Sequence, residues 1–179
     1  LKGFCGGFSD GTYGYVVPLY NGASFGTVAR FDLATFGNVE VLDLTATSSD
    51  LKGFHGGFHD GTYGYVIPFN NGNPFGKVAR FDLATFGNVE VLDLTATSSD
   101  LKGFSGGFHD GTYGYLVPFS NGNFFGTVAR FELATFGNVE VLDLTTTSND
   151  LKGFSGGFLD GTYGYVVPNN NGHPFGTVA

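Results

Sequence analysis

The chain has 179 residues, of which 31 are Gly, 21 are Phe and 9 are Tyr, with one Cys and neither Met nor Trp. This much glycine excludes a helical bundle, and its spacing is not the every-third pattern of collagen. With 41% hydrophobic and 13% charged residues, wholesale disorder is excluded, and no apolar run approaches the roughly 18 residues of a membrane span. One Cys cannot build a disulfide framework, and the lack of Met indicates a processed chain or a segment of a longer one.

The sequence repeats every 50 residues, and each copy begins with LKGF. Copies one and two differ at eight positions, and copies two and three differ at nine. A period of this length is typical of arrays in which each unit buries its apolar face against its neighbour. We therefore expect one repeat array over residues 1–179, with three complete units and one partial unit: 1–50, 51–100, 101–150 and 151–179.

The net charge of −8 follows the repeat, because the acidic residues lie mainly in the second half of each copy. No basic stripe is present. The sequence therefore argues against nucleic acid as a partner, and we expect neither insertion into a membrane nor binding to an anionic one. The simplest role of the acidity is solubility.

Each copy begins with an extended segment that ends at a turn. In the first copy, strict alternation places Phe4 and Phe8 on one face of this segment. Asp10-Gly11 then predicts a tight turn, because Gly adopts positive φ without a Cβ clash.

The second and third segments alternate over their whole length. Over residues 12–18, the tyrosines and Val17 alternate with small residues and with Pro18, which ends the strand because it cannot donate to a ladder. Over residues 26–33, one face carries Val28, Arg30 and Asp32. The other face carries Thr27, Ala29, Phe31 and Leu33.

The fourth segment, residues 39–45, places Glu40, Leu42 and Leu44 opposite two valines. No window shows a sustained helical period, so we expect no helix longer than a turn or two. Four antiparallel strands per 50-residue unit, joined by glycine-bearing turns, predict an all-β protein of β-propeller-like blades; other all-β arrays are the alternative. We expect the following residues and their equivalents to be buried: Phe4, Phe8, Tyr15, Phe31 and Leu42.

The stretch DGTYGYVVP, followed by TVARFDLATFGNVEVLDL, resembles the YVTN-type β-propeller repeat. Such repeats run from an Asp-Gly turn to a Tyr-rich strand, then to a strand that ends in Asp and a Val-rich strand. Gly6-Gly7 before the tyrosines is similar to the glycine pair of kelch repeats. The resemblance covers the whole chain and implies a propeller architecture, but no catalytic residues, because such propellers share no common active site.

The histidines do not have the spacing of a metal site. His55 and His59 share a strand face about 13 Å apart, which is too far for one ion. His59 and His109 occupy matching positions in adjacent units, but Ser9 and Leu159 replace them in the outer units. We expect solvent-facing or stacking histidines and no bound metal.

Two recurring acidic positions have structural explanations. Asp10 precedes Gly-Thr in every copy, and we expect it to bond its own turn backbone rather than calcium. Arg30 is expected to pair with Glu40 or Asp43 on the surface. Cys5 has no placed base, and no nucleophile elbow, phosphate loop or metalloprotease signature is present, so we expect neither enzymatic activity nor a cofactor.

The copies vary mainly at unit positions 5, 9, 19, 20, 23 and 24. In a propeller blade, position 5 and positions 19–24 lie at one rim. Drift in permissive loops explains this variation most simply. If the rim instead binds a ligand, it is aromatic and Asn-rich like a glycan-binding surface, and the candidate residues are His55, Tyr20, Asn70, Ser120, Asn170 and Phe124.

Two function classes remain. Near-identical repeats without a catalytic motif favour a non-enzymatic structural or scaffold protein, extracellular and self-assembling with other copies into a ring or a fibril. The alternative is a carbohydrate- or protein-binding propeller, such as a lectin-like adhesin. About three and a half units are fewer than the roughly four to eight blades of a closed propeller, so we expect the chain not to stand alone. Repeats that stop within a strand favour a filament or a longer parent chain over a closed ring.

Overall fold

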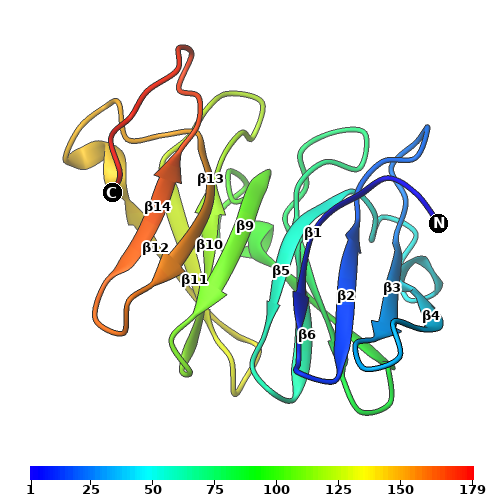
Figure 1. Ribbon diagram of the computed structural model, residues 1–179. Helices are drawn as coiled ribbons and strands as arrows, with labels where there is room; N and C mark the ends of the chain where they lie inside the picture. The colour runs from blue at the N-terminus through cyan, green and yellow to red at the C-terminus, as the bar shows by residue number, and fades with distance from the viewer.

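The computed structural model describes all 179 residues as an all-β protein (Figure 1). The first unit contains β1 (Phe4–Ser9), β2 (Tyr13–Pro18), β3 (Thr27–Asp32), β4 (Gly37–Asp43) and the short 3-10 helix η1 (Leu44–Ala46). The second contains β5 (Phe54–His59), β6 (Tyr63–Pro68), β7 (Lys77–Asp82), β8 (Gly87–Asp93) and η2 (Leu94–Ala96). The third contains β9 (Phe104–His109), β10 (Tyr113–Pro118), β11 (Thr127–Glu132), β12 (Gly137–Asp143) and η3 (Leu144–Thr146). The last contains only β13 (Phe154–Leu159) and β14 (Gly164–Pro168).

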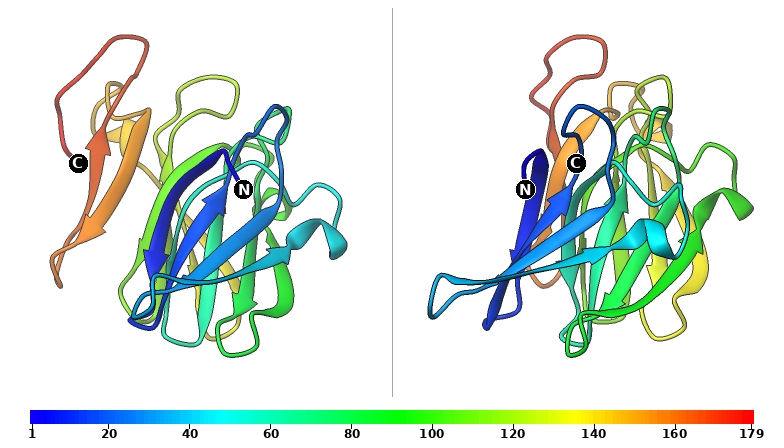
Figure 2. Two further views of the ribbon diagram at one scale, coloured as in Figure 1. Left: turned by 45° about the vertical axis from the view of Figure 1, so that its right-hand side comes forward. Right: turned by 90° about the vertical axis from the view of Figure 1, so that its right-hand side faces the viewer.

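Each complete unit is a separate antiparallel sheet whose strands follow one another in chain order, as the sequence predicts. The first strands of successive units, β1, β5, β9 and β13, lie side by side, and the sheets fan outward from them (Figures 1 and 2). The fourth strand of each complete unit is therefore an outer edge. None of the helices is long and apolar enough to span a membrane.

A one-residue bulge interrupts the first strand of each unit. In β1, the pairing with β2 shifts between Phe4 and Gly7. Gly6, inside the bulge, has a φ of 74°, and a Cβ at this residue would lie 2.8 Å from the Cα of Gly56 in the next unit. Glycine is therefore required both by the backbone conformation and by the close approach of the first strands.

The bulge makes one sequence prediction wrong, namely that Phe4 and Phe8 share a face. In the second unit, Phe54 packs with residues of the first unit, whereas Phe58 packs with residues of the third. One extra residue reverses the alternation, so these two phenylalanines point to opposite faces of the sheet. As a result, each first strand contributes one Phe to each of its two junctions.

The prediction that Leu42 and its equivalents are buried is also wrong. Leu42 and Leu92 are only half-buried and Leu142 is exposed, because the fourth strand lies at the outer edge of the sheet. Leu44 and Leu94, which begin the 3-10 turns, are fully buried instead. The turn carries these leucines from the edge strand back into the junction.

Most of the other predicted core residues are buried where a neighbouring unit covers them, but Phe8 is only half-buried although the second unit covers it. Phe81 is fully buried, but Phe31, on the uncovered face of the first unit, is half-buried. Phe58 is buried, whereas Phe158 in the last unit is exposed. The core therefore belongs to the junctions between sheets rather than to single sheets.

Candidate functional site

Each junction joins two unlike faces. We call the face that a unit turns toward the next unit its forward face, and in the first unit it carries Tyr13, Tyr15, Val17, Val28 and Arg30. We call the opposite one its back face, which carries Phe4, Val16, Ala29, Phe31 and Leu33. The junctions between units one and two, and between units two and three, bring a forward face against a back face in the same way.

A buried arginine marks the junction of units one and two. The Cζ atom of Arg30 lies 4.3 Å from the ring centre of Tyr13 and 4.4 Å from that of Phe86 in the next unit. Its Nη1 donates to the backbone oxygen of Leu83 at 3.0 Å, and its Nη2 pairs with Glu40 at 2.8 Å. Of the two predicted acidic partners, the structure selects Glu40, but the prediction of a surface pair is wrong for Arg30, because the next unit buries the arginine. The guanidinium is thus held between two rings and bonded to both units, and we call this arrangement the arginine bracket.

The same bracket recurs between units two and three. The Cζ atom of Arg80 lies 4.2 Å from the ring centre of Tyr63 and 4.3 Å from that of Phe136. Its Nη1 donates to the Leu133 oxygen at 3.2 Å, and its Nη2 contacts Glu90 at 2.9 Å. A desolvated cation–π contact is worth about 2 kcal/mol, so the bracket contributes more than an exposed surface pair.

Asp43 has another role. Its Oδ1 accepts a hydrogen bond from the Thr45 backbone N–H at 2.9 Å and caps η1. This cap fixes the start of the 3-10 turn that buries Leu44. Asp43 is therefore a capping residue.

The tyrosine beside each bracket is fixed by the Asp-Gly turn. Oδ1 of Asp10 accepts from the backbone N–H groups of Thr12 and Tyr13, which confirms the predicted turn role, and its Oδ2 accepts from the Tyr15 hydroxyl at 2.8 Å. Burial and this hydrogen bond to Asp10 raise the pKa of Tyr15 to about 12. Burial alone would raise the pKa of Asp10, but the hydrogen bonds that it accepts hold its pKa below the ordinary value.

The second ring of the bracket lies in a left-handed turn. Phe86, in the connection between β7 and β8, has a φ of 48°, and Asn88, at the start of β8, has a φ of 51°. This conformation costs a non-glycine residue roughly 1–2 kcal/mol. Contact of the Phe86 ring with Arg30, Tyr15 and Phe81 offsets that cost, because the ring is only 8% exposed.

The forward face of unit three holds an unfinished bracket. The Cζ atom of Arg130 lies 4.2 Å from the Tyr113 ring and Nη2 lies 2.6 Å from Glu140, but no second ring covers it. The Arg130 side chain is 37% exposed, against 9% for Arg80. A cavity of about 430 Å³ lies beside it, which we call the open socket; its lining includes Tyr115, Arg130, Glu140 and Leu142 of unit three and Val166 and Ala179 of the last unit.

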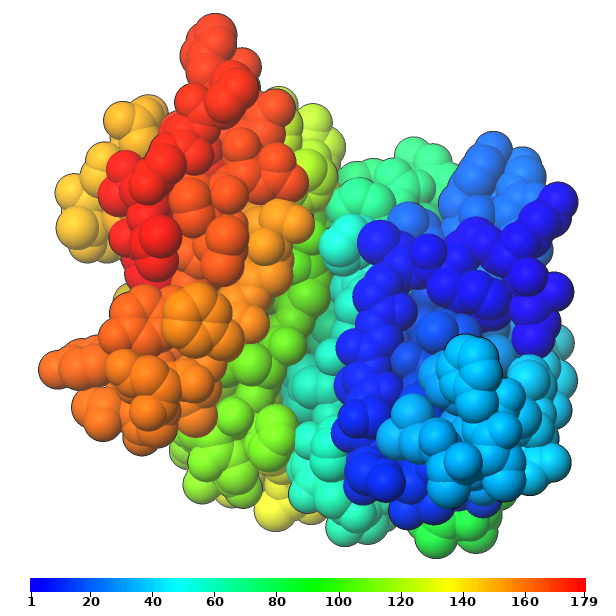
Figure 3. All heavy atoms as spheres, viewed as in Figure 1, coloured from blue at the N-terminus to red at the C-terminus, as the bar shows by residue number.

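The back face of unit one presents the missing counterpart. Phe36 has the same left-handed φ as Phe86, 49°, yet it is 85% exposed. Leu33 and Val39 are also exposed, and we call these three side chains the knob. The turn that carries Phe36 projects beyond the rest of the first unit in the right-hand view of Figure 2. Figure 3 places the first unit, in blue, and the last, in red, at the two ends of the array.

The predicted rim residues occupy equivalent loops between the second and third strands. Each loop contains an isolated bridge: Tyr20 with Ser24, Asn70 with Pro74, Ser120 with Phe124, and Asn170 with Pro174. The structure thus brings Ser120 and Phe124 together, and the Ser24 hydroxyl of the first unit donates to the Asn70 backbone oxygen of the second at 3.0 Å. Tyr20 is exposed, and the side-chain oxygens of Asn70 and Asn170 accept hydrogen bonds from their own loops.

His55 lies beside this rim. Its ring centre is 5.3 Å from that of Phe69, and burial lowers its pKa. Positions 5 and 19 therefore meet in the second unit, as expected for one rim. Whether these residues bind a ligand stays a prediction.

His59 and His109 stack on the preceding unit, as the stacking alternative predicts, whereas His173 is exposed, as the solvent-facing alternative predicts. The rings of His59 and Phe8 are 6.0 Å apart, and those of His109 and Phe58 are 5.7 Å apart. No three His, Cys, Asp or Glu side chains are grouped closely enough to hold a metal ion. Burial raises the pKa of the Cys5 thiol, whereas an activated thiol has a lowered pKa.

A scan against protein-family models found no match to this chain, and a search of curated proteins found none either.

Proposed function

We propose that this chain is a non-enzymatic structural repeat protein whose units are propeller-type blades, and that copies of it associate head to tail. In this proposal, the knob on the back face of the first unit of one copy enters the open socket of another copy, beside β13 and β14, which already cover the inner part of the forward face of unit three. The resulting contact repeats the outer part of the junction that already joins units within the chain.

The observation that carries the proposal is the complementarity of the two ends. The knob presents the Phe36 ring and the Leu33 backbone oxygen, which are the two groups that complete an arginine bracket. In the open socket, Arg130 has neither a second ring nor a backbone oxygen as a partner. Between units one and two, and between units two and three, these same partners are joined. A second copy of the chain can therefore fill the open socket with the same contacts that the internal junctions already make.

Large apolar side chains are exposed both at the knob and beside the open socket, and this supports association between copies. Phe36 is 85% exposed at one end, while Leu142 is 61% exposed at the other. Buried clusters of eleven and twelve residues form at the two complete junctions. Aromatic side chains that fill a pocket of the partner carry much of the binding free energy in protein interfaces.

The geometry of such contacts determines the form of the assembly. The two faces are different, so the contact is heterologous and leads either to a closed ring or to an open filament. Negative-stain imaging distinguishes a discrete particle from a fibre.

Size-exclusion chromatography with light scattering over a wide concentration range tests the proposal. We expect the wild-type mass to rise with concentration and Phe36→Ala to weaken association by about tenfold or more. The alanine variant keeps the Cβ atom, so the backbone cost at this position is unchanged. Tyr20→Ala, which removes another exposed aromatic away from the knob, is the matched control and should associate normally. A wild-type chain that stays monomeric throughout would contradict the proposal.

A ligand-binding rim is the second candidate function. It is favoured by Tyr20, whose side chain is 59% exposed at the end of the unit where the copies differ most. A glycan array separates the two proposals, because only the rim hypothesis expects binding that Tyr20→Ala weakens.

A further inference from the structure

The loop between the second and third strands of each unit, which we call the rim loop, contains the dipeptide Asn-Gly. The four pairs are Asn21-Gly22, Asn71-Gly72, Asn121-Gly122 and Asn171-Gly172. Each glycine is exposed, and no atom of a non-adjacent residue lies within 4 Å of the place that a Cβ would take. The backbone nitrogen after an asparagine can attack the side-chain carbon Cγ, and here no side chain shields that nitrogen. Each rim loop therefore places a nucleophile beside an amide with which it can react.

The asparagine of the pair also connects its rim loop to the preceding unit. Asn71 Nδ2 donates to the backbone oxygen of Asp50 at 3.1 Å, and Asn121 Nδ2 donates to that of Asp100 at 3.2 Å. Asp50 and Asp100 are the last residues of units one and two. The side-chain amides therefore join neighbouring units at the rim, and conversion of an amide to a carboxylate removes the donor of this bond.

The rim loops differ in what holds the nitrogen of the glycine. The Gly72 N–H donates to Asn70 Oδ1 at 2.9 Å, and the Gly172 N–H donates to the same atom of Asn170 at 2.8 Å. Ser120 stands in place of this asparagine in unit three, and it accepts no such bond from the Gly122 N–H. The nitrogen attacks after it loses its proton, and a hydrogen bond that the N–H donates favours the protonated form. The nucleophile is therefore restrained in the second unit and free in the third.

We propose that Asn121 is a site of spontaneous deamidation, and that the residue at position 20 of each unit sets the rate at the Asn-Gly pair that follows it. The deprotonated Gly122 nitrogen attacks Asn121 Cγ, so that the N–Cγ bond forms and the Cγ–Nδ2 bond breaks. Nδ2 takes up a proton and leaves as ammonia. One water molecule then opens the five-membered imide at either of its two carbonyl carbons, which leaves an aspartate or an isoaspartate. No oxidant or reductant takes part.

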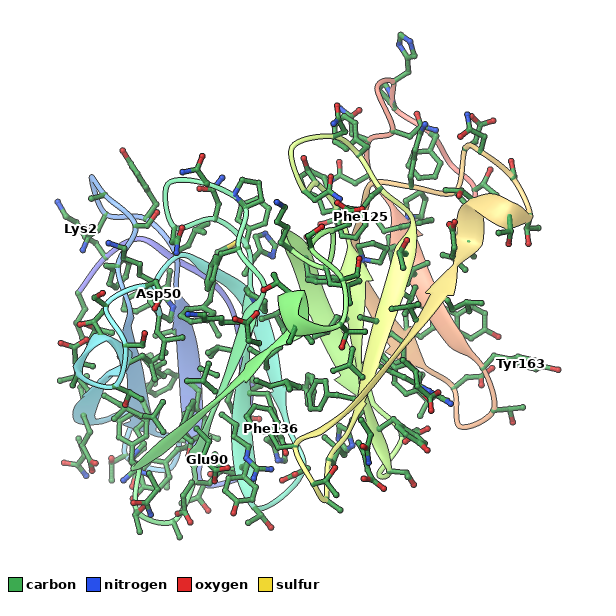
Figure 4. All side chains as sticks on the ribbon, turned by 180° about the vertical axis from the view of Figure 1, so that it is seen from behind. Lys2, Asp50, Glu90, Phe125, Phe136 and Tyr163 are labelled. Atoms are coloured by element: carbon green, nitrogen blue, oxygen red, sulfur yellow. The ribbon has the colours of Figure 1, made fainter.

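Deamidation cuts a connection between units two and three at the rim. The new carboxylate has no N–H to donate, so the Asp100 backbone oxygen loses its partner and faces a negative charge instead. Figure 4 shows Phe125, near this loop in the sequence, toward the end of the sheets opposite to Glu90 and Phe136. Those two residues belong to an arginine bracket. The modification therefore acts at the rim and leaves the brackets at the other end in place.

The Asp-Gly turns of the same units are protected from the equivalent reaction. Asp110 Oδ1 accepts from the backbone N–H groups of Thr112 and Tyr113, and its Oδ2 accepts from the Tyr115 hydroxyl at 2.8 Å. Burial alone would raise the pKa of Asp110, but these hydrogen bonds hold its pKa below the ordinary value. An ionised carboxylate is a poor electrophile, so the Asn-Gly pair is the reactive one of the two.

Timed incubation of the full chain at mildly alkaline pH, followed by peptide mapping with mass spectrometry, tests this proposal. The map measures conversion at every rim loop in the same molecules, so Asn71 serves as an internal reference for Asn121. We expect Asn121 to convert about fivefold faster than Asn71, because one hydrogen bond to the attacking nitrogen distinguishes the two loops. Asp110 should form less isoaspartate than Asn121 over the same period.

A reciprocal exchange at position 20 separates this cause from other differences between the two loops. Ser120→Asn supplies the missing acceptor for the Gly122 N–H and should slow conversion at Asn121 by about fivefold. Asn70→Ser removes the acceptor in unit two and should speed conversion at Asn71 by a similar factor. In each variant, the other loop keeps its wild-type sequence and shows by an unchanged rate that the fold is intact.

The wild-type chain unfolded in urea provides the reference without loop structure, and there Asn71 and Asn121 should convert at similar rates. The proposal is overturned if Asn121 converts in the unfolded chain but stays intact in the folded one, or if the exchanges at position 20 leave both folded rates unchanged. A difference between the two loops that persists in urea would also contradict it, because the cause would then lie in the local sequence and not in the hydrogen bond.

Discussion

Arg80 and Arg130 occupy the same place in two copies of one repeat, and their surroundings differ. Arg80 lies between Tyr63 and Phe136 with its side chain 9% exposed, while Arg130 has only Tyr113 and is 37% exposed. The difference in exposure does not arise within unit two or unit three. It arises because the following unit provides a second ring, Phe136, for Arg80 and none for Arg130. A single unit therefore carries half of a site on each face.

Phe36 and Phe86 make the same comparison from the other side. Both adopt the left-handed turn conformation, but only Phe86 has a preceding unit whose arginine and tyrosine it can cover. The backbone strain at Phe36 is the same, but its ring contacts only Phe31 of its own unit and no arginine or tyrosine of another unit.

The largest difference between a covered and an uncovered back face should appear at position 31 of the repeat. Phe81 is fully buried at a junction and packs near Tyr15, whereas Phe31 is half-buried. We expect Phe81→Ala to lower the free energy of unfolding by about 3–5 kcal/mol and Phe31→Ala by about 1–2 kcal/mol, as measured by urea denaturation. Equal losses would show that the junction adds nothing to the packing inside one sheet.

The arginines provide the second contrast. Arg80→Ala removes two ring contacts and the bond to Leu133, so we expect a loss of about 2 kcal/mol in the free energy of unfolding. Arg130→Ala removes a partly exposed pair and should cost less than about 1 kcal/mol at low protein concentration. The gap should narrow at concentrations where copies associate, because the bracket around Arg130 is then complete. A gap that does not depend on concentration would argue against a partner at the open socket.

The smallest effect concerns a feature that only one junction has. Lys77, which replaces the Thr27 and Thr127 of other units, pairs with Asp50 at 2.6 Å. The hydrogen bond from Lys77, and to a smaller extent the one from Ser48, lowers the pKa of Asp50 from 3.8 to about 2. A carboxyl group whose pKa is lower in the folded protein than in the unfolded chain stabilises the fold at any pH above its unfolded-state pKa. This stabilisation is lost as the pH falls from about 4 to about 2.

Both side chains of this pair are partly exposed, so the contribution is under about 1 kcal/mol. Lys77→Thr should flatten the acid limb of a stability-versus-pH curve in that window and leave the neutral region nearly unchanged. The control is Thr127→Lys, which tests whether the same pair with Asp100 can be built at the next junction. An acid limb that is identical in wild type and Lys77→Thr would contradict this assignment.

The strands could be predicted from the sequence because short alternating segments and Asp-Gly turns are local signals. Alternation also placed Arg30 opposite Phe31 correctly. It failed at Phe4 and Phe8, because a bulge at Gly6 reverses the alternation, and the glycine there lies in close contact with the next unit, 50 residues away. Local patterns do not record such a contact.

The arginine bracket was not predicted, although a signal was available. Every complete copy carries a Phe in the ATFGN turn, as Phe36 does in the first, between polar and glycine residues where an exposed aromatic has no local purpose. The burial of the ring is explained by an arginine and a tyrosine of the preceding unit. Pairing residues across copies of the repeat, rather than within one copy, would have pointed to it.

The most direct test of head-to-tail association is photo-crosslinking from the knob. A photoreactive phenylalanine analogue in place of Phe36 should form intermolecular crosslinks that map by mass spectrometry to the open socket, within residues 113–142 of another copy. The same analogue at Tyr20 should not reach that segment. Crosslinks from position 36 that map to the rim loops, or none between copies at concentrations where the mass has risen, would contradict the account.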